Sequence, residues 1–277
     1  MFENIKLIAV DIDGTIVKTD RTISKITIEA IEDLRKQGYL FGLATGRPVE
    51  DIINKYKEWN MSKQFDFIIG WNGCELYDDK TKITHKYNYM SKEEIKEIVE
   101  FMSKYKCTIN MYKPNSIYLS SEETDRSWYS AFKIKRTYKI AKSLEEFYNE
   151  DNGGIMFRTK EEYMKDIEAD VNTLTGKNYI GFKTQTDLME FCHKDCTKGY
   201  ALKKYAEMYN IDISDCMGFG DTSNDNEMLK VSCGVCLKNG SDDTKACAKY
   251  ITDKVCDEDG FADFVYKNLL WGEDRYG

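Results

Sequence analysis

Residues 5–15 read IKLIAVDIDGT, an apolar run that ends in two acidic residues and a glycine. A short apolar run of this kind is typical of a buried strand, whose end brings side chains to the edge of a sheet. Because successive side chains of a strand point to opposite faces, Asp11 and Asp13 can share one site only if the chain already turns at Asp13. Gly14 supplies the conformational freedom for that turn. The stretch therefore predicts a buried strand that presents carboxylates at its end.

Two other interpretations start from the same residues. The first is a strand followed by a solvated acidic turn that has no chemical role. The second is an EF-hand calcium loop, which the spacing disfavours because Gly14 is the fourth residue counted from Asp11, whereas that loop needs its glycine at the sixth position. The choice between an acidic turn and a functional site depends on the rest of the chain.

The composition indicates a folded protein that has a modest net negative charge and no cluster of basic residues. The chain has 277 residues, of which 42% are apolar, and this length suits two domains of ordinary size. Its 48 acidic and 40 basic residues give a net charge of −8 without a Lys/Arg block, so a nucleic-acid or membrane-surface role has little electrostatic support. No apolar run is long enough to span a bilayer and no signal peptide precedes the first strand, so we expect a soluble, cytoplasmic protein. The sequence leaves the oligomeric state open.

Cys233 and Cys236 have the spacing of a redox or metal-binding pair. No second pair exists to complete a zinc site, and both residues lie in an expected core strand. We therefore expect them to be reduced, structural cysteines.

The beginning of the chain alternates strand signals with helix signals. Apolar runs at 5–10, 39–44 and 65–70 predict strands. Ser24 can cap a helix after the first run, and Pro48 suits the first turn of a helix after the second. Strand, helix, strand, helix and strand in this order are typical of a parallel α/β sheet.

The middle of the chain follows a different pattern. Alternating segments mix with helices there, one of which begins with a capping box formed by Ser91 and Glu94. Beyond the middle segment the α/β alternation returns. We therefore predict an α/β fold in which residues 1–82 and 189–277 build a doubly wound parallel sheet and residues 83–188 form an inserted α+β domain.

Most of the expected strands and helices that could meet at one edge of the sheet end or begin with residues that can bind ions. They are Asp11 and Asp13, then Thr45 and Gly46, then Asp221 with Asn224 and Asp225, and Lys198 at a helix start. Ligands of open parallel sheets gather at the carboxyl ends of the strands. Converging carboxylates repel one another unless a hard cation lies among them, and oxygen ligands favour Mg²⁺. Carboxylates with Mg²⁺, the Thr45 hydroxyl, the N–H groups of a helix start and Lys198 are together the parts of a phosphoryl-transfer site.

Four stretches resemble, in order, the motifs of the haloacid dehalogenase superfamily: DIDGT at 11–15, LATGRP at 43–48, TKG at 197–199 and GFGDTSND at 218–225. The long insert between the second and third motifs, and the segment GVCLKNG at 234–240, resemble the Cof-type branch of that superfamily. The resemblance covers essentially the whole core. It implies an Mg²⁺-dependent phosphatase of small phosphorylated metabolites.

The resemblance also implies a role for each motif residue. Asp11 becomes the nucleophile, ionised at neutral pH because Mg²⁺ and Lys198 favour its charged form. Asp13 becomes the general acid and base, and its backbone carbonyl also binds the metal. The implied metal set is Asp11, Asp13, Asp221 and Asp225, with Asp225 supporting the others from behind. The implied phosphoryl-binding set is Thr45, Gly46, Lys198 and Asn224.

The insert is expected to close over the site and to exclude water. Its candidate substrate contacts are Tyr112, Tyr118, Arg126 and Arg158. Sugar phosphates and cofactor phosphates are both open as substrates. A phosphomutase would share the core residues, and a metabolite-phosphate sensor without catalysis would keep the pocket, although it has no need of both Asp11 and Asp13.

Overall fold

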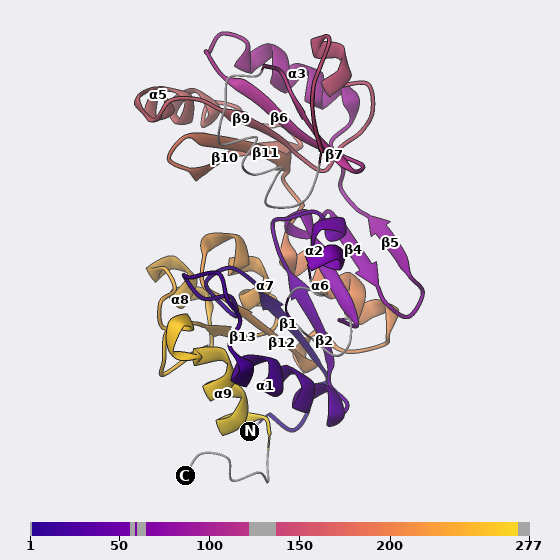
Figure 1. Ribbon diagram of the computed structural model, residues 1–277, viewed down its shortest axis with the longest axis vertical. Coiled ribbons are helices and arrows are strands. Elements are labelled where there is room, and N and C mark those ends of the chain that lie inside the picture. The colour runs from indigo at the N-terminus through magenta and orange to yellow at the C-terminus, as the bar shows by residue number, and fades with distance from the viewer. Residues whose placement is uncertain (1, 56–58, 60–64, 122–136, 271–277) are drawn as a thin grey trace. The chain divides into compact units, whose positions relative to one another are not determined.

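The computed structural model describes residues 2–55, 59, 65–121 and 137–270. The chain folds into two compact units (Figure 1). The first unit comprises Met1–Tyr87 and Thr197–Gly277, and the second unit comprises Asn88–Cys196. Arg126, one of the expected substrate contacts, lies outside the described residues.

A mostly parallel sheet forms the centre of the first unit. Its strands lie in the order β14-β13-β12-β1-β2-β3-β4-β5; β4 pairs antiparallel with β3 and with β5, and the other neighbouring pairs of described strands are parallel. The strands are β1 (Leu7–Asp11), β2 (Leu40–Ala44), β3 (Phe67–Gly70), β4 (Glu75–Asp78), β5 (Ile83–Lys86), β12 (Cys216–Gly220), β13 (Cys233–Cys236) and β14 (Tyr250–Ile251). Because β1, β2 and β12 are parallel neighbours, their carboxyl ends reach the same edge of the sheet.

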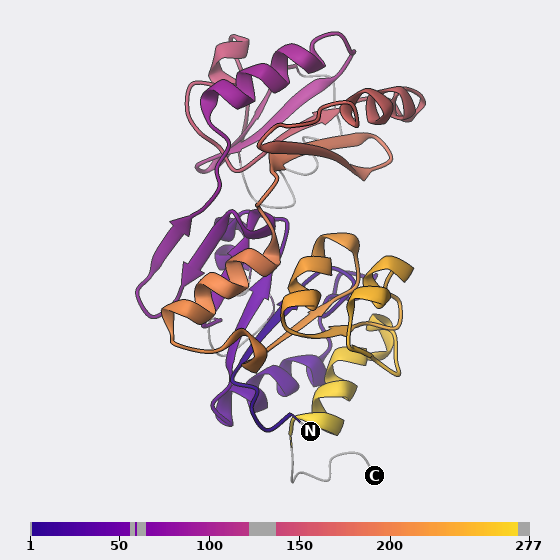
Figure 2. The ribbon, with the colours of Figure 1, turned by 180° about the vertical axis from the view of Figure 1, so that it is seen from behind.

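Helices cover both faces of this sheet (Figures 1 and 2). They are α1 (Lys25–Lys36), α2 (Val49–Lys55), α6 (Lys198–Met208), α7 (Asn226–Val231), α8 (Asp242–Cys247) and α9 (Gly260–Asn268). Ile8 and Val10 of β1 share a hydrophobic cluster with α1, α2 and α9, whereas Leu7 and Ala9 share one with α6 and α7. This two-sided core confirms the predicted doubly wound α/β fold. Because Asp11 continues the series of Leu7 and Ala9, its side chain lies on the α6 side.

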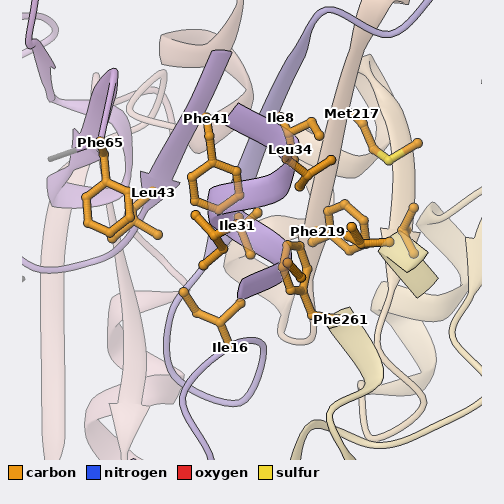
Figure 3. Packing of buried hydrophobic residues seen from close by; sticks show 14 of the residues in the cluster. Ile8, Ile16, Ile31, Leu34, Phe41, Leu43, Phe65, Met217, Phe219 and Phe261 are labelled. Carbon is orange, nitrogen blue, oxygen red and sulfur yellow. The ribbon is translucent and has the colours of Figure 1, made fainter. Parts of the chain in front are cut away.

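The sequence of α1 explains its place in the core. The Ser24 side chain caps the helix by accepting a hydrogen bond from the backbone N–H of Thr27 at 3.2 Å. Ile31 and Leu34 follow at helical spacing and are fully buried. They lie against Phe41 in the cluster that Figure 3 shows, and burying a side chain of this size contributes about 1.5–3 kcal/mol.

The second unit is a mixed sheet that carries helices. Its strands lie in the order β10-β11-β9-β6-β7-β8, and only β7 and β8 pair in parallel among the described strands. The elements are α3 (Lys92–Met102), β6 (Thr108–Lys113), β7 (Ser116–Leu119), β8 (Thr137–Ile140), β9 (Ile155–Arg158), α5 (Glu161–Val171), β10 (Tyr179–Gln185) and β11 (Leu188–His193). The predicted capping box of Ser91 and Glu94 is confirmed at the start of α3. This mixed sheet with helices matches the expected α+β character of the middle segment.

Short 3₁₀ helices complete both units: η2 (Trp71–Gly73), η3 (Leu144–Phe147), η4 (Ile213–Asp215), η5 (Ser223–Asp225) and η6 (Cys256–Glu258). Asn72 and Gly73 lie in η2, which joins β3 to β4.

The compact units divide the chain a few residues away from the expected boundaries at 83 and 188. β5 pairs with β4 and so lies in the sheet of the first unit, while β11 pairs with β9 and β10 in the sheet of the second unit. The expected boundaries placed β5 in the insert and residues 189–193 of β11 outside it. The alternation of apolar and polar residues predicts a strand, but it does not determine which sheet that strand joins.

The sequence also led to expectations about membrane spans and about the pair Cys233 and Cys236. None of the described helices has the length and hydropathy that a membrane crossing requires. Cys233 and Cys236 are free cysteines in β13, as the sequence indicated for this pair.

Candidate active site

Three carboxylates meet at the carboxyl ends of β1 and β12. Asp11 is the last residue of β1, Asp221 follows β12 directly, and Asp225 ends η5. One carboxylate oxygen from each lies within 4.8 Å of the other two, and all three residues are buried. The structure therefore brings together three of the residues that the sequence singled out.

Lys198 supplies the positive charge of this cluster. It is the first residue of α6, whose start is capped by the Thr197 side chain, and its own side chain is fully buried. Its Nζ donates to Asp11 Oδ1 at 2.6 Å and to Asp225 Oδ1 at 2.7 Å. Burial alone would lower the pKa of Lys198, but the charges of Asp11 and Asp225 outweigh it and raise the pKa. The ammonium group therefore stays charged at neutral pH.

Asp225 uses both carboxylate oxygens within the protein. Its Oδ1 accepts from Lys198, and its Oδ2 accepts from the backbone N–H of Asp221 at 3.0 Å and of Thr222 at 3.1 Å. Because both oxygens accept hydrogen bonds from the protein, the Asp225 carboxylate fixes the backbone at Asp221 and Thr222. This geometry suits a supporting role behind the other carboxylates.

Asp221 lies against the turn that follows β1. Its Oδ1 accepts a hydrogen bond from the hydroxyl of Thr15 at 2.9 Å. A Cβ atom at residue 14 would lie 2.4 Å from Asp221 Oδ2, and Gly14 has a φ of +89°. Glycine is required there for both reasons, because a side chain would collide with the carboxylate and strain the backbone.

Asp13 stands apart from the three clustered carboxylates. Its side chain is about half exposed, at 56%, and its carboxylate accepts two hydrogen bonds from Arg47 Nη2 at 2.9 and 2.7 Å. The carboxylate of Asp13 is therefore not part of the group of three carboxylates that could hold a cation. The expected contribution of its backbone carbonyl stays a prediction.

Thr45 and Gly46 follow the end of β2. The Thr45 hydroxyl oxygen accepts from the backbone N–H of Arg47 at 3.2 Å, which is the local turn that a capping threonine forms. Gly46 packs against an amide side chain, since a Cβ there would lie 3.2 Å from Asn72 Oδ1.

Asn72 links this loop to the loop after β12. Asn224 Nδ2 donates to Asn72 Oδ1 at 3.1 Å, and Asn224 Oδ1 accepts from the Thr222 hydroxyl at 2.8 Å. Asn72 is buried and has a φ of +53°. Asparagine tolerates this left-handed conformation better than most residues. The backbone N–H of Asn72 donates to the carbonyl oxygen of Thr45 at 3.0 Å. Three of the four predicted phosphoryl-binding residues, Thr45, Gly46 and Asn224, are thus connected through Asn72.

Sequence reasoning gave no role to Arg47 or to Asn72. Arg47 is a basic residue within the motif LATGRP at 43–48. A basic residue in one motif and an acidic residue in another was the signal that could have suggested a pair with Asp13. Asn72 precedes Gly73, and because Asn-Gly is a common turn pair, the local sequence indicates only a turn. Its side-chain contact with Asn224 joins residues far apart in the sequence, and local sequence does not encode such a contact.

Burial raises the pKa values of two of the clustered carboxylates, those of Asp11 and Asp221. Burial raises the pKa of Asp11 well above its ordinary value, and the attraction of Lys198 offsets this only in part. Burial and the charge of Asp225 raise the pKa of Asp221 to about 6. A positive charge beside Asp11 in addition to Lys198 would favour the ionised form of Asp11 that the sequence led us to expect.

A family model described as haloacid dehalogenase-like hydrolase matches residues 8–265. The chain belongs to this family. The resemblance that the four motifs indicated is thereby confirmed, and it extends over both compact units.

Individual relatives of this haloacid dehalogenase-like hydrolase are similar over nearly their whole length. A Bacillus subtilis protein named 5-amino-6-(5-phospho-D-ribitylamino)uracil phosphatase is 26% identical over 269 residues, which cover 94% of this chain and 96% of the relative. The crystal structure of a haloacid dehalogenase-like hydrolase from Bacteroides thetaiotaomicron matches with a TM-score of 0.84 and 23% identity, covering 95% of this chain and 99% of that one. A structure described as a subclass IIB sugar phosphatase has a TM-score of 0.80 at 24% identity, covering 95% and 98%. The two structures support the fold.

The buried aspartates of this hydrolase suit a metal ion. Three carboxylates surround one ammonium group, so the cluster has an excess of negative charge when all are ionised. Its donors are all oxygen atoms, which hard divalent cations prefer. Asp11 and Asp221 are the carboxylates that would hold such an ion, because both oxygens of Asp225 already accept hydrogen bonds from the protein.

Magnesium affinity is expected to fall in acid. Because the pKa of Asp221 is raised to about 6, a proton competes with the cation for this carboxylate once the pH drops below that value. We expect protonation of Asp221 to increase the Kd for a divalent cation by up to about tenfold for each pH unit below this point. Calorimetric titration with Mg²⁺ from pH ~7.5 to pH ~5 measures this, with Asp221→Asn as the comparison in which only the contribution of Asp11 is left. An affinity that stays constant over the range would contradict the assignment of Asp221 as a ligand.

Proposed function

We propose that this haloacid dehalogenase-like hydrolase is an Mg²⁺-dependent phosphatase that hydrolyses small phosphorylated metabolites through an aspartyl phosphate on Asp11. The observation that carries the proposal is the environment of Asp11. Its carboxylate is held by a buried lysine beside Asp221, and a second acid, Asp13, lies two residues away but outside the cluster. The relative named as a phosphatase of a phosphorylated ribitylamino-uracil supports a small phosphorylated metabolite as substrate.

Asp11 and Asp13 divide the chemistry. An oxygen of Asp11 attacks phosphorus, the bond from phosphorus to the alcohol oxygen breaks, and Asp13 gives its proton to that oxygen. Asp13 then takes a proton from water, the water oxygen attacks phosphorus, and the bond to Asp11 breaks with release of inorganic phosphate. Bound Mg²⁺ supplies positive charge that balances the phosphoryl oxygens and Asp11. Lys198 supplies a second, fixed positive charge at Asp11.

Arg47 determines where the Asp13 carboxylate lies. Two hydrogen bonds to one guanidinium nitrogen hold the carboxylate on the exposed side of the turn. We propose that this ion pair keeps the Asp13 carboxylate away from the clustered carboxylates.

Asp13→Asn is expected to slow the reaction by about 10²–10⁴-fold, because it removes proton transfer to the leaving group and from the attacking water. The loss in the first step depends on the leaving group. An alkyl phosphate, whose alkoxide is a poor leaving group, should lose more of its single-turnover rate than an aryl phosphate, whose phenoxide leaves without a proton. Rapid-quench measurement of both substrates tests the role. Equal losses for the two substrates would argue against Asp13 as the general acid.

A panel of phosphorylated sugars, sugar alcohols and cofactors tests the proposed function directly. We expect release of inorganic phosphate from some members, with loss of activity after chelation and recovery on addition of Mg²⁺. The yield of phosphate should equal the yield of free alcohol, whereas a phosphomutase would return an isomeric phosphate ester. Binding of panel members without turnover would instead indicate a sensor and would refute the proposal.

A further inference from the structure

The η2 segment has a left-handed backbone over three successive residues. Trp71, Asn72 and Gly73 have φ of +48°, +53° and +109°. A residue with a side chain pays for this conformation, because its Cβ approaches the following carbonyl oxygen. At Gly73 a Cβ atom would also lie 2.0 Å from the carbonyl oxygen of Thr197 at the start of α6. Non-glycine residues keep such a conformation only where their surroundings hold them, and these segments cluster at functional sites.

Backbone hydrogen bonds hold η2 against the loop after β2. The N–H of Trp71 donates to the carbonyl oxygen of Arg47 at 2.9 Å, and the N–H of Asn72 donates to that of Thr45 at 3.0 Å. Trp71 and Asn72 are both buried. The backbone of Asn72 is therefore fixed relative to the loop that carries two of the predicted phosphoryl-binding residues.

The Asn72 side chain fixes one end of the Asn224 amide. Asn224 is exposed, and an exposed side chain samples several rotamers unless other groups hold it. Its Nδ2 donates to Asn72 Oδ1 at 3.1 Å, and its Oδ1 accepts from the Thr222 hydroxyl at 2.8 Å. Because Thr222 is itself exposed, the buried Asn72 is the rigid end of this chain of hydrogen bonds.

The Asn224 amide has a second donor for a ligand. An amide nitrogen carries two N–H bonds. Within the described part of the chain, the hydrogen bond to Asn72 uses one of them. The other can donate to a phosphoryl oxygen, which is the role that the sequence predicts for Asn224.

We propose that Asn72 is a positioning residue that orients the Asn224 amide for the phosphoryl group before the substrate binds. This inference rests on the phosphoryl-binding site of the proposed phosphatase function. An amide that is already held loses less side-chain entropy when it binds a ligand. A purely structural Asn72 would supply only its left-handed backbone, and loss of its side chain would not change the affinity for phosphate.

Asn72→Gly removes the side chain and keeps the backbone, because glycine adopts a positive φ without strain. We expect the KM of a hydrolysed substrate and the inhibition constant of inorganic phosphate to increase by about 3- to 10-fold, the effect of losing one hydrogen bond. The value of kcat should change by less than about twofold, because the contact is made equally in the ground state and the transition state. Unchanged phosphate affinity would show that only the backbone of Asn72 matters and would overturn the inference.

A double-mutant cycle tests whether Asn72 acts through Asn224. Asn224→Ala alone should raise KM and the phosphate inhibition constant at least as much as Asn72→Gly does. In the double variant, Asn72→Gly should add less than about 1.5-fold, because the amide that it orients is already absent. Factors that multiply would mean that Asn72 acts independently of Asn224, contrary to the inference.

Asn210→Gly is the matched control for the backbone. Asn210 belongs to the same compact unit, has the same φ of +53° as Asn72 and is exposed. Its replacement should leave KM and the phosphate inhibition constant unchanged. An increase equal to that of Asn72→Gly would show a general effect of glycine at a left-handed position and would contradict the inference.

A measurement on the wild-type protein makes the test independent of the folding of Asn72→Gly. The ¹⁵N heteronuclear NOE of the Asn224 side-chain amide, assigned by its absence from Asn224→Ala, reports motion on the ps–ns timescale. In the phosphate-free protein we expect an ordered amide, with an NOE close to that of the backbone amides of β12. A side chain that becomes ordered only when phosphate is added would refute orientation by Asn72.

Binding of inorganic phosphate separates this inference from the proposed function. Phosphate is titrated calorimetrically into the wild-type protein and the three variants of the cycle in the presence of Mg²⁺. If no ester is hydrolysed but phosphate binds with the expected non-additivity between Asn72 and Asn224, the inference stands and the phosphatase proposal falls. If esters are hydrolysed but Asn72→Gly leaves the Kd for phosphate unchanged, the phosphatase proposal stands and the inference is wrong.

Discussion

Asp11→Asn is expected to lower the rate of phosphate release by at least about 10⁴-fold, because an amide cannot form the aspartyl phosphate. Asparagine keeps the size of the side chain and still offers Oδ1 to Lys198, which now donates to Asp11 at 2.6 Å. The loss should therefore appear in kcat, while binding of Mg²⁺ and substrate changes less. Steady-state phosphate release at saturating substrate measures the effect. Turnover close to the wild-type rate would refute Asp11 as the nucleophile.

The same substitution is not expected to unfold the protein. The pKa of Asp11 is raised in the folded state, so folding disfavours its ionised form. An acid with a raised pKa lowers stability as the pH rises from its unfolded value through its folded value, and this cost is fully present above the folded pKa. Asp11→Asn removes that cost in the metal-free protein. Its melting temperature at neutral pH should thus be similar to or above that of the wild-type protein, which separates a chemical loss from a folding loss.

Lys198→Met is expected to have the largest effect on stability. It leaves Asp11 and Asp225 buried without the ammonium group that lies 2.6 and 2.7 Å from them. Removing one partner of a buried ion pair costs about 3–5 kcal/mol in the free energy of unfolding. Urea denaturation of the metal-free variant at neutral pH measures this cost. A variant as stable as the wild-type protein would show that the buried lysine does not compensate these carboxylates.

The pH dependence of Lys198→Met provides its control. Without the lysine, the two carboxylates can avoid burying charge only by taking up protons. The stability deficit should therefore shrink as the pH falls, and Mg²⁺ should recover part of it at neutral pH by replacing the missing positive charge. Lys230→Met is a matched substitution, because Lys230 makes a salt bridge to Glu227 while its side chain is 51% exposed. It should cost less than about 1 kcal/mol at any pH.

The positions of the clustered carboxylates could be predicted from the sequence because they depend on strand order alone. Apolar runs that end in Asp11 and just before Asp221 indicated parallel strands, and parallel strands bring their carboxyl ends to one edge. Lys198 was predictable for a similar reason, as the first residue of a helix with a capping threonine before it.

Other parts of the site depend on contacts that no local pattern encodes. The pairing of Asp13 with Arg47 and of Asn224 with Asn72 requires the folded positions of separate loops. The burial of Glu190 in β11 is likewise not predicted by the local sequence. An acid within an alternating strand predicts an exposed position, and only the structure shows that this residue is 8% exposed.

Chemical trapping of the covalent intermediate tests the central claim most directly. Borohydride reduces an aspartyl phosphate to homoserine, so the protein is quenched with it during turnover of a hydrolysed substrate in the presence of Mg²⁺, and the peptide that contains residue 11 is analysed by mass spectrometry. The account predicts homoserine at position 11, dependent on substrate and absent from Asp11→Asn. Steady phosphate release with no modification at Asp11, or with modification at Asp13 or Asp221 instead, would contradict it.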